Sequence, residues 1–247
     1  MNSNINKKTQ FRNLGLIDYK EAWDYQTELF QQTLAIKKTN RDLPINDQLP
    51  TNNYLLFCEH PHVFTLGKSG DANNLLLQEE MLKTKRATYY HSNRGGDITY
   101  HGPGQLVGYP VIDLENFFTD IHQYMRLLEE SIISTLNDFN IRAGRIAGLT
   151  GVWIDFENKI NARKICALGV KTSRWVTMHG FALNINTDLN YFDYIVPCGI
   201  KDKAVTSLAK ELGAPQDFEK ISNILKGHFA RLFEMEIISD ERNYSSK

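Results

Sequence analysis

The stretch RGGDITYHGPGQL, from Arg94 to Leu106, packs four glycines, a proline, an arginine and a histidine into thirteen residues. Glycines at this density let the backbone approach a ligand closely or adopt positive φ. Ile98, Thr99 and Tyr100 are β formers, so the stretch predicts a short strand between two glycine-rich corners. Residues 107–114 follow it and are typical of a buried strand. A pair of tight turns around a short strand is the alternative interpretation.

The composition is that of an ordinary globular chain. It has 247 residues, of which 42% are hydrophobic, and a formal net charge of -1. This suits one large domain over residues 1–247, or a domain with a small appendage, and indicates no basic nucleic-acid face. No apolar run approaches the roughly 18 residues that span a bilayer. Residues 1–8 are polar and do not resemble a secretory signal. We therefore expect a cytoplasmic protein that binds neither nucleic acid nor membrane.

Three cysteines are widely spaced in the chain, at Cys58, Cys166 and Cys198. Their odd number argues against a disulfide framework. The sequence has no Cys-x-x-Cys or His-x-x-x-His pair, so it does not indicate structural zinc. We expect at least two of the three thiols to be plain buried residues.

Clusters of strands separated by long helices predict an α+β fold and not a regular βα alternation. Residues 1–13 are expected to be frayed, and residues 39–53 have the composition of a loop that forms an insertion or a mobile cover. Asp18 is expected to cap a helix that ends near Lys38. Further strands are expected at residues 54–59, 63–67, 87–90, 152–156, 164–171 and 180–186. Further helices are expected at residues 117–139, 204–212 and 217–233.

Cys198 is the candidate nucleophile, because it lies between Pro197 and Gly199 at the end of an irregular segment. A thiol reacts as the thiolate, so a nearby positive charge must lower its pKa from about 8.5. Lys164, at the start of an otherwise buried strand, is one candidate for that charge, and His101 and His179 are two others. The alternatives are a cysteine that only packs, a solvated lysine and histidines that belong to turns.

Motifs for nucleotide phosphates and for a serine nucleophile are absent from the sequence. There is no Gly-x-x-x-x-Gly-Lys-Ser/Thr, and no Gly-x-Gly-x-x-Gly joins a strand to a helix. A Gly-x-Ser-x-Gly elbow is also missing. His179 has no spacing to Cys198 that favours a Cys-His-Asp protease over chance.

Several blocks of the chain resemble the lipoyl(octanoyl) transferases, which move an octanoyl group from acyl carrier protein to a lysine of lipoyl domains. Residues 94–106 resemble the signature of that family. Further blocks along most of the chain are similar to the family at residues 14–19, 21–23, 60–67, 164–170, 179–184, 197–199 and 205–208. Together these blocks are far more specific than any one of them. Residues 39–53 depart from the family by being longer than its compact pattern.

The resemblance implies a mixed β-sheet flanked by helices, as in the catalytic domains of biotin and lipoate protein ligases. It implies that Cys198 takes the acyl group as a thioester and that Lys164 lowers the thiol pKa and shuttles protons. It implies no cofactor and no metal. The segments that match the acyl pocket of the family are Arg94, Gly95, Gly96, Asp97, Ile98, Thr99, Tyr100, His101, Ala167, Leu168, Gly169, Gly180, Phe181 and Ala182.

The implied partners are octanoyl-acyl carrier protein as donor, and as acceptors the lipoyl domains of 2-oxoacid dehydrogenase complexes and the glycine cleavage H protein. Such partners are acidic, so we expect a basic patch near the pocket mouth. Its candidate members are Lys68, Lys171, Arg174, Lys201 and Lys203, and for each one taken singly solvated surface charge is the simpler interpretation. An ATP-dependent lipoate or biotin ligase and a non-catalytic acyl-binding protein are the rival functions. The pairing of Cys198 with Lys164 argues against both.

Overall fold

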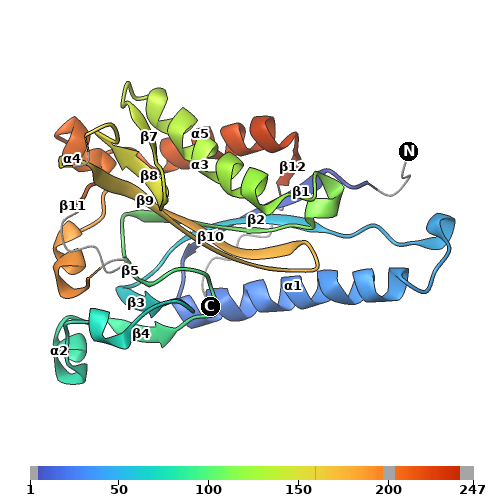
Figure 1. Cartoon of the computed structure of the whole chain (residues 1–247), viewed down its shortest axis with the longest axis horizontal. Helices are drawn as coiled ribbons and strands as arrows, with labels where there is room; N and C mark the ends of the chain where they lie inside the picture. Colours follow the sequence, from blue (N-terminus) through green and yellow to red (C-terminus); the bar gives the residue numbers. More distant parts are fainter. Residues whose placement is uncertain (1–4, 159, 197–203, 240–247) are drawn as a thin grey trace.

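The strands expected at residues 54–59, 152–156, 164–171 and 180–186 lie in one large mixed β-sheet (Figure 1). The structure is a computed structural model and describes residues 5–158, 160–196 and 204–239. The strands are β1 (Lys8–Leu16), β2 (Asn53–Glu59), β3 (Val63–Leu66), β4 (Thr88–His91), β5 (Ile98–His101), β6 (Gln105–Val111), β7 (Ala143–Ile146), β8 (Leu149–Ile154), β9 (Arg163–Ser173), β10 (Val176–Asn184), β11 (Ala204–Val205) and β12 (Glu236–Ser239). The α-helices are α1 (Tyr19–Asn40), α2 (Glu79–Thr84), α3 (Ile121–Asn137), α4 (Leu208–Leu212) and α5 (Phe218–Phe233). The short 3-10 helices are η1 (Ile45–Asp47), η2 (Ala72–Asn74), η3 (Leu114–Asn116) and η4 (Leu189–Tyr194).

Within the described residues the large sheet has nine strands, in the order β12-β1-β2-β6-β10-β9-β8-β7, with β11 paired to β9. β1 runs parallel to both β2 and β12, whereas β2, β6, β10, β9, β8 and β7 pair antiparallel in that order. A smaller sheet has the order β4-β3-β5. The predicted α+β class, with a mixed sheet flanked by helices, is confirmed.

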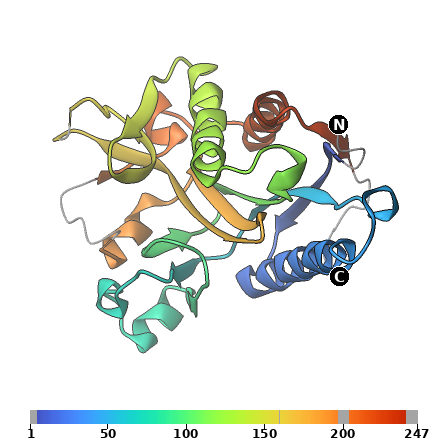
Figure 2. The same cartoon turned by 45° about the vertical axis from the view of Figure 1, so that its right-hand side comes forward.

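Helices cover both faces of the large sheet (Figure 1, Figure 2). α3 and α5 pack on one face and α1 packs on the other. β2 shows the consequence for sequence, because Leu55 and Phe57 face the α3–α5 side while Leu56 and Cys58 face α1. Successive side chains of a strand point to opposite faces. A strand covered on both faces therefore reads as one continuous apolar run. Among the described residues, no helix is long and apolar enough to cross a membrane.

The small sheet contains the middle of the glycine-rich stretch, as β5. β3 pairs parallel with β4 and antiparallel with β5, with Val63 opposite His101 and Leu66 opposite Ile98. Phe64 and Tyr100 lie in its own apolar cluster. The predicted strand between two glycine-rich corners is thus present, as β5.

Helix ends agree with the capping residues in the sequence. The Asp18 side chain accepts from the backbone N–H groups of Lys20 and Glu21, so α1 begins where predicted. Asp120 caps α3 in the same way, so that helix begins later than the predicted residue 117. Asp217 caps α5.

The expectation that residues 1–13 are frayed is wrong for residues 8–13, which belong to β1. This strand pairs with β2 on one side and β12 on the other. Backbone pairing on both sides satisfies its N–H and C=O groups although its side chains do not alternate cleanly. Only a distant segment, β12, completes this pairing, so the local pattern did not reveal it.

The expected helix over residues 204–212 is shorter than predicted. Ala204 and Val205 form β11, whose partners on β9 are Arg163 and Lys164. The Ser207 side chain accepts from Lys210 N, so α4 starts at Leu208. Pairing with β9 decides the conformation of Ala204 although alanine is a strong helix former, and the β-branched Val205 suits the strand.

Residues 39–53 are partly helical, because α1 continues to Asn40 and η1 follows. The Asn40 side chain fastens the loop to α1, donating to Leu49 O at 2.7 Å and accepting from Leu49 N at 2.9 Å. The mobility of this segment stays a prediction.

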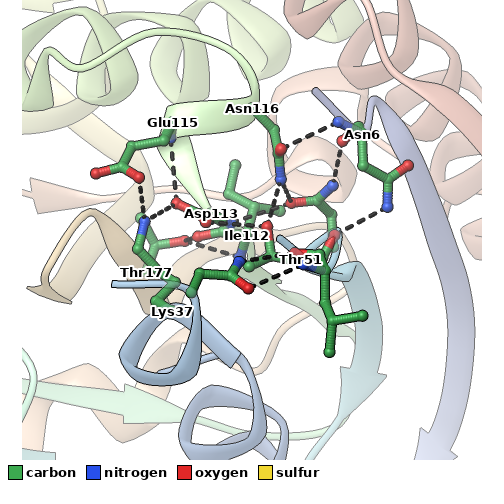
Figure 3. Close-up of polar contacts among 11 residues, drawn as sticks. Asn6, Lys37, Thr51, Ile112, Asp113, Glu115, Asn116 and Thr177 are labelled. Carbon is green, nitrogen blue, oxygen red and sulfur yellow. Dashed lines mark hydrogen bonds and ion pairs between the residues drawn. The ribbon is translucent and has the colours of Figure 1, made fainter. Parts of the chain in front are cut away.

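A buried polar cluster joins the end of α1 to the starts of β2 and η3 (Figure 3). Asp113 is its centre, and its carboxylate accepts from Lys37 Nζ at 2.5 Å and from Thr51 Oγ1 at 2.9 Å. Asn53 Oδ1 accepts from Asp113 N at 3.0 Å. Buried charges require such partners, so this cluster sets where the long α1 lies against the sheet.

Candidate functional site

A cavity of about 540 Å³ opens where the glycine-rich stretch crosses β9 and β10. Its size is typical of a small-molecule site. Most of its apolar wall comes from the large sheet, α3 and η4, through Val107, Met125, Leu149, Trp153, Leu168, Val170, Phe181, Phe192 and Val205. Polar side chains line the rest, among them Tyr19, His101, Tyr109, Lys164 and His179.

Glycines let the backbone of residues 94–96 lie directly on β9. Gly95 N donates to Val170 O at 2.9 Å. A Cβ at Gly169 would lie 2.8 Å from Gly95 O, closer than real Cβ contacts allow. Gly96 has φ +87°, in the left-handed region that favours glycine. The wall of the cavity therefore depends on the absence of side chains at these positions.

Arg94 turns its guanidinium back onto β3 and does not point to the solvent. Its Nε and Nη2 donate to Thr65 Oγ1 at 3.3 and 3.0 Å, and Nη2 also donates to Thr65 O at 2.5 Å. The side chain lies almost fully buried beside the cavity. Arg94 thus fastens the glycine-rich segment to the small sheet.

Lys164 enters the cavity from β9, where two neighbours hold its backbone. It pairs with Trp153 of β8 and with Val205 of β11. The register of β8 against β9 shifts between Val152 and Trp153, a bulge of the kind that re-aims a side chain. Lys164 Nζ lies 4.7 Å from the centroid of the Trp153 ring. The amine therefore lies against the aromatic wall of the cavity.

Buried imidazoles and phenols line the cavity near β6 and β10. Burial lowers the pKa of His101 to about 3 and the pKa of His179 to about 3. Burial also raises the pKa of Tyr19 and of Tyr109. His101 Nδ1 donates to Gln105 Oε1 at 2.8 Å, and His179 Nε2 donates to Asn93 Oδ1 at 2.7 Å. All four groups are uncharged at neutral pH, so neither histidine supplies the positive charge that a thiolate needs.

The structure brings most of the expected site residues together. All expected pocket residues line this cavity except Tyr100, and Lys164 lines it too. Tyr100 lies instead in the core of the small sheet, where its ring centroid is 4.9 Å from that of Tyr191. Cys198 lies outside the described residues. Phe192 before it and Val205 after it both line the cavity.

The sequence did not single out the aromatic and aliphatic wall. Leu149 and Trp153 of β8, Met125 of α3 and Phe192 of η4 come from three separate elements and share no common motif. Tyr19 could have been found from the sequence, because it is the last residue of the block at residues 14–19 that resembles the family. The other two cysteines, Cys58 and Cys166, are buried in the core, and burial raises the pKa of each thiol. Low exposure and a raised pKa make both poor nucleophiles.

The expected basic patch is only partly beside this cavity. Lys68 and Lys171 flank residues 94–95, because Lys68 N donates to Arg94 O at 2.9 Å and Lys171 follows Val170. Partial burial, together with the charge of nearby Lys68, lowers the pKa of Lys171. Arg174 lines a second cavity at the tip of the β9–β10 hairpin. Lys201 and Lys203 lie outside the described residues. Within the described ranges, no three His, Cys, Asp or Glu side chains gather as metal ligands.

A family model described as the lipoyl protein ligase A/B catalytic domain matches residues 18–230. The chain belongs to the lipoyl protein ligase A/B family. The matched range begins at the cap of α1 and ends within α5, so it includes every described residue that lines the cavity.

Close relatives carry a more specific name. A protein of Cytophaga hutchinsonii named octanoyltransferase is 60% identical over 237 residues, which is 96% of this chain and 97% of the relative. A protein of Flavobacterium johnsoniae with the same name is 59% identical over 235 residues, which is 95% of this chain and 100% of the relative. The resemblance to octanoyltransferases inferred from the sequence blocks is confirmed.

Solved structures show the same fold at low identity. A putative lipoate protein ligase from T. acidophilum with bound lipoic acid has a TM-score of 0.65 at 15% identity, covering 94% of this chain and 89% of that one. Lipoate-protein ligase A bound with ATP has a TM-score of 0.65 at 16% identity, covering 98% and 97%. These likenesses confirm the ligase-like fold.

Proposed function

We propose that Cys198 receives an octanoyl group as a thioester and passes it to a lysine of a lipoyl domain, with Lys164 moving the protons. Octanoyl transfer in protein lipoylation is the activity of this chain, because relatives at 59–60% identity over nearly its whole length are octanoyltransferases. The thioester, the acyl carrier protein donor and the identity of the acceptors are the parts proposed.

The position of Lys164 carries the proposal. It lines the cavity, and its backbone pairs with Val205, which is seven residues after Cys198 in the chain. Chain connectivity thus ties the proposed nucleophile to the strand that pairs with the lysine. Lys164 is also the group in this cavity suited to the task, because His101 and His179 are neutral at physiological pH.

The proposed chemistry runs in two half-reactions. The Cys198 thiolate, favoured by the Lys164 ammonium, attacks the carbonyl carbon of the octanoyl thioester of the carrier. The tetrahedral intermediate collapses, and the carrier sulfur leaves with a proton from Lys164. Neutral Lys164 then accepts a proton from the attacking amine of the lipoyl domain. That amine displaces Cys198 as a thiolate and leaves an amide on the acceptor.

The cavity matches the proposed cargo. Octanoyl is a flexible apolar chain, which favours an apolar slot with a few polar groups. The residues that line it include Ala167–Gly169 of β9, Gly180–Ala182 of β10 and most of residues 94–99. The binding role of these residues is part of the proposal.

The test follows the acyl group by mass. The protein, mixed with octanoyl-acyl carrier protein, should gain one octanoyl group on the peptide that contains Cys198, and hydroxylamine should release it. Cys198→Ala should lose both the adduct and transfer to a lipoyl domain, whereas Cys166→Ala should keep both. Lys164→Ala should slow acylation by roughly 10²–10⁴-fold.

Two outcomes would contradict the proposal. An octanoyl adduct that survives in Cys198→Ala would exclude this nucleophile. Transfer that needs ATP and accepts free octanoate, without a protein thioester, would favour an adenylate-forming ligase on the same fold.

A further inference from the structure

Glu129 is a buried carboxylate on α3 that faces the β7–β8 hairpin. Its side chain is 3% exposed. Oε2 accepts from Arg126 Nη1 at 2.6 Å and from Arg145 Nε of β7 at 2.8 Å. Oε1 accepts from Gly151 N of β8 at 3.3 Å. One carboxylate thus fastens both strands of the hairpin to α3.

Gly151 is the link between this carboxylate and Lys164. Its φ is +125°, a conformation that side chains rarely adopt. A Cβ at Gly151 would lie 3.3 Å from Lys164 Cε and 2.8 Å from Cys166 O. The stem of Lys164 therefore rests on the Gly151 backbone, whose N–H is the group that Glu129 holds.

The same hairpin supplies the rest of the wall around the lysine. Leu149 and Thr150 line the cavity just before Gly151, and Trp153 follows it with the ring against Lys164 Nζ. Met125, one helical turn before Glu129, lines the cavity from α3. A shift of the hairpin away from α3 would therefore move two groups that contact Lys164, namely the Gly151 backbone and the Trp153 ring.

We propose that Glu129 is a positioning residue for octanoyl transfer: it holds the Gly151 backbone under Lys164 and provides the negative charge that favours the ammonium form. This inference rests on the proposed role of Lys164. It assigns a role to a carboxylate that does not itself line the cavity.

The charges around Lys164 come from several elements. α3 contributes Glu129 and Arg126, and β7 contributes Arg145, which also pairs with Glu130 at 2.8 Å. On β9, Arg163 pairs with Glu211 of α4 at 2.6 Å and with Asp155. Glu129, Glu130, Arg126 and Arg145 together sum to zero. Glu129 is the buried carboxylate of this group, at 3% exposed against 40% for Glu130, so solvent screens the loss of the Glu129 charge least.

The Cys166 thiol is a second point where these charges meet. Besides burial, which raises the pKa of Cys166, the Lys164 ammonium lowers that pKa and the Glu129 carboxylate raises it. Both charges thus act on one buried sulfur, in agreement with the contact chain from Glu129 through Gly151 to Lys164.

The decisive experiment is the pH profile of Cys198 acylation, followed by mass in single turnover. Glu129→Gln keeps the size of the side chain and leaves the cluster with a net positive charge, which disfavours the Lys164 ammonium. Its acylation should slow at least 10-fold, and the profile should move to lower pH by roughly 0.5–1 unit. Glu130→Gln is the matched control on the same helix, because Glu130 is 40% exposed and is not the partner of Gly151 N. It should change the rate less than about 2-fold.

Arg145→Gln covers the case in which Glu129→Gln does not fold. It removes a positive charge from the same cluster and should move the profile to higher pH. Shifts of opposite sign support the inference. An unchanged profile in both variants, or shifts of the same sign, would overturn it. Lys164→Ala is run alongside: if it acylates at the wild-type rate, the proposed function fails at its lysine, whereas an inactive Lys164→Ala with unshifted Glu129 and Arg145 variants defeats this inference alone.

Discussion

Gly169 shows how much of the site depends on the absence of a side chain. The Gly95 carbonyl oxygen occupies the space in which a Cβ at Gly169 would lie. Backbone cannot move aside as a flexible side chain can, so the glycine-rich segment can lie on β9 only if this position stays glycine. Gly95 and Gly169, which are far apart in the sequence, thus contact each other directly.

Three buried histidines predict how stability depends on pH. Burial lowers the pKa of His60 to about 4, and the pKa values of His101 and His179 to about 3. The unfolded chain takes up protons near pH 6.5, whereas the folded chain resists them until about pH 3–4. The free energy of unfolding should therefore fall as the pH drops below about 6.5, by roughly 1.4 kcal/mol per pH unit for each histidine.

Urea unfolding between pH 7 and pH 4.5 measures this slope. His60→Gln should reduce it by roughly one third, since one of the three groups is removed. His122→Gln, at an exposed position of α3, is the control and should leave the slope unchanged. A slope that is equal in wild type and His60→Gln would contradict the assignment.

At the scale of elements, the long α1 depends on the Asp113 cluster for its place on the sheet. Lys37, near the end of α1, pairs with buried Asp113 and also with Glu115, whose side chain is 52% exposed. Two carboxylates therefore share one ammonium in different environments. The buried one should matter far more, because its loss leaves the mostly buried Lys37 without its shielded partner.

Asp113→Ala should lower the free energy of unfolding by roughly 3–5 kcal/mol. Glu115→Ala, which removes the exposed partner of the same lysine, should lower it by less than about 1 kcal/mol. Chemical denaturation of the two variants at neutral pH provides the comparison. Equal losses would mean that the cluster does not stabilise the protein through its buried pair.

In the proposed mechanism, the β7–β8 hairpin supports Lys164 without carrying the nucleophile. It supplies Trp153 and the Gly151 backbone to Lys164, and α3 holds it through Glu129. Its local sequence predicts one strand, at residues 152–156. Only the packing of the hairpin on α3 shows that its backbone supports the Lys164 side chain.

At the scale of the whole molecule, the cavity opens beside a small basic rim made of Lys68 and Lys171. Each lies next to a residue that lines the cavity, namely Ser69 and Val170. Nearby like charges are costly unless a partner neutralises them. An acidic carrier protein is a partner of that kind.

The double variant Lys68→Gln, Lys171→Gln should raise KM for octanoyl-acyl carrier protein roughly 5- to 30-fold and weaken its salt dependence, with little change in kcat. A small octanoyl thioester that lacks the protein should show no such rise. Lys226→Gln is the control, because Lys226 lies on α5, on the other face of the sheet. An equal rise in KM for both donors would place the effect in the cavity and not in docking.

Part of this architecture follows from the sequence because its signals are local. The caps at Asp18 and Asp217 and the continuous apolar run of β2 depend on neighbours a few residues away. By contrast, β1 becomes a strand only through β2 and β12, and Ala204–Val205 becomes one only through β9. The sequence could not show that Tyr100, unlike its neighbours, does not line the cavity. Its position depends on which face of β5 packs into the apolar cluster of the small sheet.

The sequence by itself determined the family, the long helices and most of the expected residues that line the cavity, because each rests on a local motif or on chain periodicity. Tertiary structure alone decided that the Trp153 ring lies against Lys164 and that His101 and His179 are neutral. It also decided that Glu129 binds the Gly151 backbone, which contacts the Lys164 side chain. The physical reason is that burial and contact across strands depend on register and on the packing of distant elements, which no window of the sequence contains.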